Sequence, residues 1–360
     1  MSIHFHPLTV KEIIKETSDC VSVLFDVPNE LKPEFQFTQG QSLTMRSMIN
    51  GEEVRRSYSI CSSPLENKLK VAIKKVEDGL FSTFANEQLK NGDVLEVMSP
   101  VGKFNTPLLS SNKKNYLAFV AGSGITPLLS IIKTTLATEP NSTFTLVYGN
   151  KSRASIIFFE ELEGLKNKYF NRFNIIHILS REKTDAAINF GRITKDKCVD
   201  LTQKLIDITD ADEFFICGPE EMIFAVKHFL GSKGVKETKI HFELFTTPGG
   251  KKATSHTLQA ASNAGPHSNI TIKLDGRSFD FTIPFNSDDS ILDVAMQQGA
   301  DVPYACKGGV CCTCKAKLLE GEVTMDVHWG LEHEEIEQGY ILTCQSHPVT
   351  EKVVIDFDVK

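Results

Sequence analysis

Apolar and polar residues alternate with a period of two through the first third of the chain, which is the pattern of half-buried β-strands. Gly, Pro and Asn turns separate these runs, and one helical stretch, 82–89, interrupts them. The pattern predicts a small antiparallel β-barrel over residues 1–108. The predicted strands include residues 21–27, 41–47, 55–60, 69–76 and 93–99.

The rhythm changes over residues 113–245, where an apolar run, a turn and an amphipathic helix follow one another repeatedly. Such a βαβ series predicts an α/β domain with a parallel sheet covered by helices. The predicted strands are residues 116–122, 143–149, 174–180 and 213–218, and the predicted helices are 126–136, 158–165 and 219–230.

The last third of the chain begins with residues 246–269, which are small and polar, lack hydrophobic periodicity and predict a flexible linker. Residues 270–360 predict a compact α+β domain that is β-grasp-like. Its helix is expected to begin at Asp289 or Ser290 and to end at Gly299. The predicted strands of this domain are residues 269–275, 277–283, 314–320 and 352–357.

Length and charge narrow the class of protein. A chain of 360 residues suffices for two or three domains, and its formal net charge of −7, without a long basic block, argues against nucleic acid as a partner. No run approaches the roughly 18 apolar residues of a membrane span, and the N-terminus lacks the features of a signal peptide. We therefore expect a soluble, cytoplasmic protein with neither nucleic-acid nor membrane partners.

Five of the nine cysteines lie in the last third of the chain. Cys306, Cys311 and Cys314 have the spacing C-x4-C-x2-C, and Cys344 follows after 29 residues, which is the pattern of plant-type [2Fe-2S] ferredoxins. These four are the predicted cluster ligands. A structural zinc site is the alternative, although such sites usually contain two C-x2-C-like pairs. Cys312 is a fifth thiol in the loop that could replace a neighbour, but its spacing makes it a bystander.

A second motif lies in the predicted barrel, where Arg56, Tyr58 and Ser59 fit the pattern R-x-Y-S. An arginine can neutralise a diphosphate through paired hydrogen bonds, and an aromatic ring can lie against a flavin. A serine hydroxyl can bond near the flavin N5, where hydride arrives. Taken alone, such a strand is more often simply an exposed one.

Neighbouring segments change that interpretation. Gly79, Ser82 and Thr83 open a predicted helix, whose N-terminus is a ready site for an anion. Residues 100–104, PVGKF, end the predicted barrel. Together with R-x-Y-S, these segments resemble the ferredoxin-NADP reductase superfamily. The resemblance implies FAD as the flavin, with its diphosphate at this helix start, and gives the R-x-Y-S residues the roles described above.

The α/β segment carries a third motif, in which Gly122, Gly124 and Thr126 belong to the sequence G-S-G-I-T-P between a strand and a helix. Backbone N–H groups of such a turn can approach phosphates. The spacing departs from G-x-G-x-x-G, and a lone G-x-G turn is as often tight packing. The longer motif, however, is similar to that of the superfamily, which implies binding of a nicotinamide nucleotide.

Cys217, Gly218 and Pro219 follow a predicted strand at the carboxyl end of the sheet, where open α/β sheets bind ligands. The resemblance implies that Cys217 lies beside the nicotinamide ring. The alternative is a small buried hydrophobic residue, which is the usual state of a single cysteine.

Ser180 and Arg181 end another predicted strand and resemble the superfamily's contacts to the 2′-phosphate of NADPH. Enzymes that use NADH often place an acidic residue near the ribose hydroxyl instead. We therefore expect NADPH to be preferred to NADH. The alternative is that these residues, with Lys151 and Arg153, are solvated loop residues.

Glu243 and Phe245 end the α/β segment as E-x-F, which is similar to the terminus of ferredoxin-NADP reductases. The resemblance implies that Glu243 lies near Ser59 and the nicotinamide, and that Phe245 covers the flavin until the nicotinamide displaces it. For Phe245 an ordinary strand end is an equal alternative. Ser59, Cys217 and Glu243 are thus the predicted catalytic residues.

The order of the segments resembles the reductase components of bacterial multicomponent oxygenases. This resemblance implies that electrons pass from NADPH to FAD, then to the [2Fe-2S] cluster and to an oxygenase component, first of all that of phenylacetyl-CoA epoxidation in phenylacetate degradation. A Rieske-type or other multicomponent oxygenase is the alternative acceptor. An electron-transfer module with a vestigial flavin domain is a further alternative, against which the intact motifs speak. We expect the acceptor at the surface of residues 307–310, with charge contributed by residues 332–337.

Overall fold

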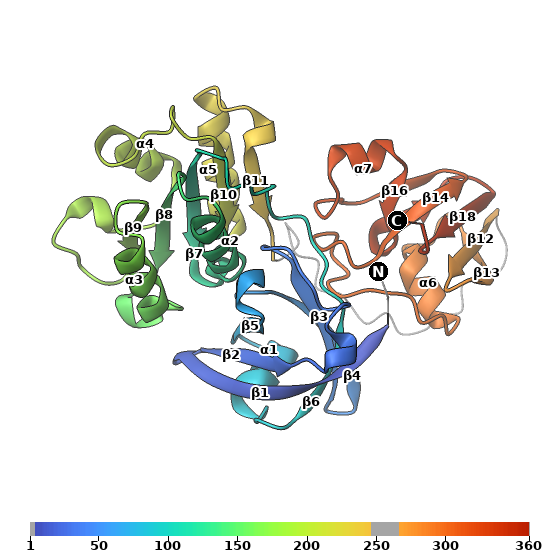
Figure 1. The fold of residues 1–360 in the computed structure, drawn as a ribbon. Helices are drawn as coiled ribbons and strands as arrows, with labels where there is room; N and C mark the ends of the chain where they lie inside the picture. The colour runs from blue at the N-terminus through green and yellow to red at the C-terminus, as the bar shows by residue number, and fades with distance from the viewer. Residues whose placement is uncertain (1–3, 246–265, 360) are drawn as a thin grey trace. The chain divides into compact units, whose positions relative to one another are not determined.

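The structure is a computed structural model that describes residues 4–245 and 266–359 (Figure 1). The chain divides into two compact units, with the boundary between Leu244 and Phe245. Of the predicted linker, residues 246–265 lie outside the described residues. No helix in the described ranges is long and apolar enough to cross a membrane.

The larger unit begins with six strands, which are β1 (Phe5–Thr17), β2 (Cys20–Asp26), β3 (Ser42–Ile49), β4 (Glu52–Ser59), β5 (Leu69–Lys74) and β6 (Val94–Met98). They form an antiparallel sheet in the order β4-β3-β6-β1-β2-β5. A bridge between Ile60 and Val71 joins its two outer strands and closes the sheet into the predicted barrel. Helix α1 (Leu80–Glu87) follows β5 and begins two residues before the prediction.

The second part of this unit is a parallel sheet in the order β11-β10-β7-β8-β9, as the βαβ pattern predicted. The chain runs outward from β7 to β9 and then returns to β10 and β11 on the other side, so the strand order reverses between β7 and β10. The elements are β7 (Asn115–Ala121), α2 (Ile125–Thr138), β8 (Thr143–Asn150), α3 (Phe159–Lys168), β9 (Phe173–Leu179), α4 (Lys195–Lys204), β10 (Glu213–Cys217), α5 (Glu220–Ser232) and β11 (Ile240–Glu243).

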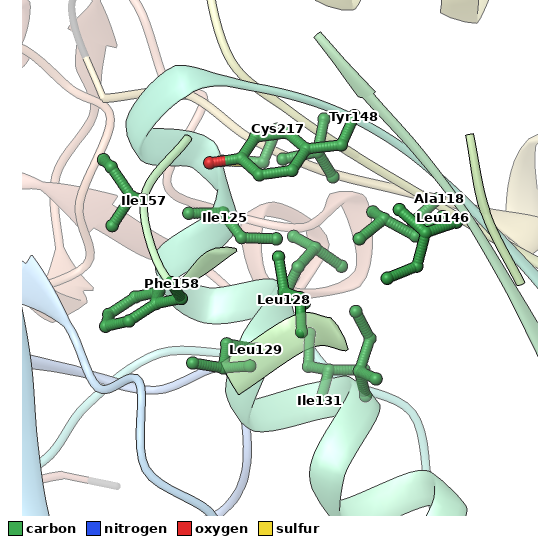
Figure 2. Close-up of a cluster of buried hydrophobic side chains, with 14 of the residues drawn as sticks. Ala118, Ile125, Leu128, Leu129, Ile131, Leu146, Tyr148, Ile157, Phe158 and Cys217 are labelled. Atoms are coloured by element: carbon green, nitrogen blue, oxygen red, sulfur yellow. The ribbon is translucent and has the colours of Figure 1, made fainter. Parts of the chain in front are cut away.

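Helix α2 supplies much of the apolar core around the parallel sheet, and the barrel has a separate core of its own. Leu128 and Leu129 of this helix are fully buried and belong to one cluster with Leu146 of β8 and Cys217 of β10 (Figure 2). Each fully buried side chain of leucine size contributes about 1.5 to 3 kcal/mol relative to exposure. Because Cys217 belongs to this cluster, the core itself fixes the carboxyl end of β10.

The barrel and α2 are held together by polar contacts. The hydroxyl of Ser130 donates to the carbonyl oxygen of Ser62 at 2.7 Å, and the hydroxyls of Ser63 and Thr134 lie 2.8 Å apart. Lys133 Nζ also lies 2.6 Å from Glu66 Oε1 and 2.5 Å from Glu161 Oε1. Buried hydrogen bonds and paired charges of this kind define one relative position of the two parts.

The smaller unit contains a five-stranded sheet in the order β13-β12-β18-β14-β16 and a separate pair, β15-β17. The N-cap of α6 is Ser290, whose hydroxyl accepts from the amide of Asp293, so Ser290 rather than Asp289 begins the helix. β12 starts three residues inside the predicted linker. The elements are β12 (His267–Leu274), β13 (Arg277–Pro284), α6 (Ile291–Gln297), β14 (Lys315–Glu320), β15 (Val323–Met325), α7 (His333–Glu337), β16 (Tyr340–Leu342), β17 (Ser346–Pro348) and β18 (Lys352–Asp356).

Candidate functional site

The reversal of strand order places a ligand-binding position at the carboxyl ends of β7 and β10. The turn Gly122–Gly124 follows β7, and Gly218 follows β10. A Cβ at Gly124 would lie 2.2 Å from the carbonyl oxygen of Cys217, so this turn and the end of β10 are in direct backbone contact. The structure thus brings together two motifs that are about 95 residues apart in the sequence.

The backbone at Gly122 leaves room for a ligand. Its φ of +55° favours glycine, and no atom lies within 4 Å of the position of a Cβ. The hydroxyl of Tyr148, in the neighbouring strand β8, donates to the Gly122 carbonyl oxygen at 3.0 Å and holds the turn in place. Thr126 contributes to the same turn by donating to the carbonyl oxygen of Ser123 at 3.1 Å. These residues fit the phosphates of a nicotinamide nucleotide, while Pro219 serves as the N-cap of α5.

Ser59 and Glu243 meet across the two halves of the larger unit. The Ser59 hydroxyl, at the end of β4, donates to Glu243 Oε2 at 3.2 Å. Glu243 ends β11 and lies beside Cys217 in the parallel register of β10 and β11. The structure therefore gathers all three residues predicted to be catalytic at one edge of the parallel sheet.

The protonation states at this edge follow from burial. Burial raises the pKa of Glu243 to about 7, even though the hydrogen bond from Ser59 opposes the shift. Burial, and then the charge of Glu243, raise the pKa of the Cys217 thiol well above its ordinary value. Glu243 can therefore gain and lose a proton near neutral pH, as a general acid or base requires, while Cys217 stays a neutral thiol.

Arg56 and Arg55 have different environments on β4. Arg55 is buried and its Nε lies 2.7 Å from Glu53 Oε1, so it is already paired. Arg56 is exposed, and its Nη1 donates to the carbonyl oxygen of Arg55 at 2.7 Å. Since a guanidinium has five N–H donors, Arg56 keeps donors for an anionic group. The ring of Tyr58 is half-buried and lies 5.6 Å from that of Phe81.

The start of α1 is a tight loop built around Ser82. Its hydroxyl accepts from the amide of Val76 and donates to the carbonyl oxygen of Gly79, both at 3.1 Å. A Cβ at Gly79 would lie 2.5 Å from that hydroxyl, so a larger residue there would displace the Ser82 side chain from these bonds. Thr83 is half-buried in the first turn. α1 contacts β4, so its unpaired first-turn amides and Arg56 together fit a diphosphate such as that of FAD.

The ends of β8 and β9 carry the residues predicted to choose the nucleotide. The amide of Arg181 donates to the carbonyl oxygen of Lys151 at 2.8 Å, and Ser180 bonds through both its amide and its hydroxyl to the carbonyl oxygen of Asn150. Arg181 is exposed and Ser180 half-buried. Glu182 Oε2 accepts from the amide of Arg153 at 2.8 Å, so the adjacent acidic side chain holds the loop.

Phe245, after β11, is 41% exposed.

The cysteine loop brings the four predicted ligands together. The thiols of Cys306 and Cys311 lie 3.2 Å apart, and the thiol of Cys344 interacts with those of Cys306 and Cys314. The hydrogen bonds from Cys311 and Cys344 lower the pKa of Cys306 and raise the pKa values of Cys311 and Cys344, because the thiols lie within hydrogen-bond distance of one another. Burial raises the pKa of the Cys312 thiol to about 11, and Lys315, Glu335 and Cys314 also act on this thiol.

The backbone of the loop also fits a cluster. The amide of Gly308 donates to Cys306 Sγ at 3.3 Å, as N–H groups around an iron–sulfur cluster do. Gly309 has a φ of +71°, and a Cβ there would lie 2.6 Å from Val327 Cγ2. Within the described ranges no three His, Cys, Asp or Glu side chains converge as ligands of a single metal ion, whereas a two-iron cluster divides its four thiolates between the irons.

Two expectations about the surface of this unit need correction. In the segment 307–310, Gly308 and Gly309 are buried, because the loop turns its backbone inward to the thiols. In the acidic segment 332–337, which contains the whole of α7 and its N-cap, Glu335 is buried and its Oε1 lies 2.8 Å from Lys315 Nζ. Glu335 therefore belongs to the interior of the unit, and only its neighbours contribute surface charge.

Comparison with known proteins identifies all three parts of the chain. Residues 7–106 match the oxidoreductase FAD-binding domain, residues 119–228 the oxidoreductase NAD-binding domain, and residues 272–349 the 2Fe-2S iron-sulfur cluster binding domain. The bound groups are accordingly FAD, a nicotinamide nucleotide and a [2Fe-2S] cluster, and the zinc alternative for the cysteine loop is set aside.

Relatives match over nearly the whole length. The chain is 45% identical to a subunit of the 1,2-phenylacetyl-CoA epoxidase from Escherichia coli strain K12, over 99% of this chain and 98% of the relative. It is 34% identical to the ferredoxin reductase component of 3-ketosteroid-9-alpha-monooxygenase from Rhodococcus rhodochrous, over 97% and 96% of the two chains. The solved structure of phthalate dioxygenase reductase shares the fold, with a TM-score of 0.58, 24% identity and 98% of each chain covered. The chain therefore belongs to the ferredoxin-NADP reductase-like oxidoreductases that join FAD-binding, NAD-binding and 2Fe-2S ferredoxin domains, a type found as the reductase components of oxygenase systems.

Proposed function

We propose that this reductase passes electrons from NADPH through FAD and the [2Fe-2S] cluster to the oxygenase component of phenylacetyl-CoA epoxidation. The observation that carries the chemistry is that one chain holds both the Ser59–Glu243 pair, 3.2 Å apart, and the four-thiol loop. The 45% identity to a phenylacetyl-CoA epoxidase component over 99% of the chain favours this pathway. The four thiols must stay reduced to bind iron, which fits work in the cytoplasm.

In the hydride step, Ser59, Cys217 and Glu243 are the proposed catalytic residues. When bound, FAD supplies the centre that accepts hydride and donates single electrons. The hydroxyl of Ser59 would bond near that centre, and Glu243, with a pKa of about 7, could take up the proton that the reduced flavin gives up once its two electrons have left. Cys217, buried and neutral, limits how deeply the nicotinamide ring can enter.

The remaining flavin contacts come from the barrel. Arg56 and the start of α1 at Gly79, Ser82 and Thr83 hold the diphosphate of FAD, and Tyr58 packs against its ring. Phe245 covers the ring until the nicotinamide displaces it, which agrees with its 41% exposure. These assignments give Arg56 a binding role and leave the chemistry to Ser59 and Glu243.

NADPH rather than NADH is the proposed donor. Gly122, Gly124, Thr126, Gly218 and Pro219 line the position for its nicotinamide half and diphosphate. At the ends of β8 and β9, the exposed Arg181 and the hydroxyl of Ser180 bind the 2′-phosphate. Positive charge with hydrogen-bond donors at this point distinguishes a phosphate from a ribose hydroxyl.

A second acceptor is supported by the 34% identity to the reductase component of a 3-ketosteroid-9-alpha-monooxygenase. On this alternative the partner is a Rieske-type or other oxygenase, and the reductase chemistry stays the same. The choice between the two depends on the partner alone.

Reconstitution tests the proposal. The purified chain, loaded with FAD and cluster, is mixed with NADPH and with the oxygenase subunits of a phenylacetyl-CoA epoxidase, and product is measured with phenylacetyl-CoA as substrate. We expect turnover that requires the chain and NADPH. A chain ending at Phe245 should still reduce ferricyanide but support no turnover. Full turnover with the shortened chain would show that electrons do not leave through the cluster. Turnover only with a steroid or other oxygenase would assign the second acceptor.

A further inference from the structure

The surface beside the cysteine loop carries the only tryptophan of the chain, Trp329, which is 41% exposed. We propose that Trp329 is the apolar anchor of the docking surface for the electron-accepting oxygenase component, a partner that offers an apolar recess bordered by basic groups. This inference rests on the proposed function and specifies how that acceptor is recognised. Neither the pattern of the sequence nor the expected contact segments pointed to this residue.

Backbone contacts fix the tryptophan next to the cluster ligands. The amide of Gly330 donates to the carbonyl oxygen of Gly309 at 2.8 Å. A Cβ at Gly330 would lie 2.5 Å from the carbonyl oxygen of Cys311, so the residue after Trp329 packs directly on a ligand's backbone. Val327 packs on the other side of the same loop, against Gly309. Trp329 therefore stands between two residues that touch the loop.

The four predicted cluster ligands differ in exposure. This difference indicates that electrons leave at the edge of the cluster held by Cys306 and Cys311. Cys306 and Cys311 are partly exposed, whereas Cys314 and Cys344 are buried. A partner that takes electrons has to approach the exposed edge, because the protein covers the other one. Exposed hydrophobic residues occur singly on most proteins, but tryptophan is enriched among the residues that carry binding energy in interfaces.

The charged residues near the tryptophan indicate which charge the partner's surface should carry. Asp326, Glu334 and Glu337 are exposed and lie within eight residues of Trp329 in the sequence. Asp326 lies 3.4 Å from His347 and Glu337 lies 3.3 Å from His333, while Lys307 of the loop pairs with Asp293 at 3.0 Å. The segment 326–337, which contains the tryptophan, has five acidic residues and no lysine or arginine, so its formal charge is negative. Charges at the border of an interface act on association rate and on the choice of partner, which favours an acceptor with basic groups.

Steady-state kinetics of the full-length holoprotein tests the anchor. In Trp329→Ala, the KM for the oxygenase component should rise about 10- to 100-fold, as expected when a central aromatic residue is truncated. Ferricyanide reduction and the rate at which NADPH reduces the cluster should stay within about twofold of wild type. Trp329→Phe should recover part of the loss. Leu319→Ala is the matched control, because Leu319 is 46% exposed on the same unit at the far end of β14 from the loop.

A binding measurement gives an independent readout. Because there is one tryptophan, a chain labelled with 5-fluorotryptophan has one fluorine resonance, which unlabelled oxygenase component should shift or broaden. An unchanged resonance while sedimentation shows the complex would overturn the proposal. So would an unchanged KM in Trp329→Ala, or slower reduction of the cluster by NADPH with an unchanged acceptor KM, because Trp329 would then serve transfer within the chain.

The same variants separate this inference from the proposed function. If wild-type protein gives no epoxidation but reduces cytochrome c, a basic one-electron acceptor, the proposed partner is wrong, and cytochrome c becomes the probe of the surface. The KM for cytochrome c should then rise in Trp329→Ala and also in a Glu334→Gln, Glu337→Gln double variant. Equal KM values in wild type and Trp329→Ala would overturn the inference.

Discussion

The cysteine loop and the Ser59–Glu243 site reach their geometry by opposite routes. Three of the four cluster ligands lie within nine residues, and their loop places its own backbone N–H groups around them. Ser59 and Glu243 are 184 residues apart, and they meet only because barrel and parallel sheet are held together through α2. A locally encoded site depends on its ligands, whereas an assembled site depends also on everything that fixes its two halves.

The largest expected effect tests the local site. Replacing Cys306, Cys311, Cys314 or Cys344 with serine should abolish the [2Fe-2S] EPR signal and the brown colour, because each residue supplies one of four thiolates. Iron content should fall from about two per chain, the number in one [2Fe-2S] cluster. Cys312→Ser is the control and should keep the cluster. Loss of the cluster in this control would make Cys312 a ligand and refute the assignment.

The next largest effect concerns the assembled site. Ser59→Ala should slow reduction of the flavin by NADPH about 10- to 1000-fold, as loss of a polarising donor does, while flavin content stays unchanged. Stopped-flow absorbance at the flavin band measures the rate. Ser232→Ala is the control and should behave as wild type, because the Ser232 hydroxyl donates to the carbonyl oxygen of Phe229 within its own helix. An equal rate in Ser59→Ala would remove the residue from the chemistry.

A smaller effect is expected at the ends of β8 and β9. Arg181→Ala should lower kcat/KM for NADPH and spare NADH, because a charge-assisted bond to the 2′-phosphate contributes roughly 1.5 to 3 kcal/mol, or about 10- to 150-fold. Lys183→Ala, in the same exposed loop, is the control. Equal losses with both nucleotides would mean that Arg181 only supports the loop.

The smallest effect is on stability. Because burial raises the pKa of Glu243 from its ordinary value to about 7, the neutral form stabilises the folded protein at low pH, and this contribution is lost as pH rises through 7. Between pH 5 and pH 8, the unfolding free energy of Glu243→Gln should rise by about 1 to 3 kcal/mol relative to that of wild type. Chemical denaturation at both pH values measures it, with Glu12→Gln, at an exposed strand position, as control. A gap that does not change with pH would contradict the burial argument.

The same distinction explains what the sequence could predict. Hydrophobic periods indicated the barrel and the parallel sheet, and cysteine spacing indicated the ligands, because both signals are local. Helix α4 was missed because it buries only Cys198 and Leu201, which leaves almost no apolar stripe. The burial of Glu335 was missed because its partner, Lys315, lies across the loop.

Tertiary contacts account for the rest of the candidate site. No periodicity connects Ser59 with Glu243; their proximity was expected only from resemblance to a family, and the structure places the two groups 3.2 Å apart. Trp329 was missed altogether, because exposure beside a particular loop is a property of the folded chain. Sequence spacing finds ligands within a loop, but it does not find the surface that the loop presents.

The backbone contact between Gly124 and Cys217 has a consequence for engineering. The atom that a Cβ at position 124 would meet, at 2.2 Å, is a main-chain oxygen, so no replacement of the Cys217 side chain can make room for it. A side chain at position 124 would therefore have to displace the main chain at the end of β10. A directed-evolution library aimed at switching nucleotide preference should keep this position constant and place its diversity at exposed positions such as Lys151 and Arg181, which no such contact restricts.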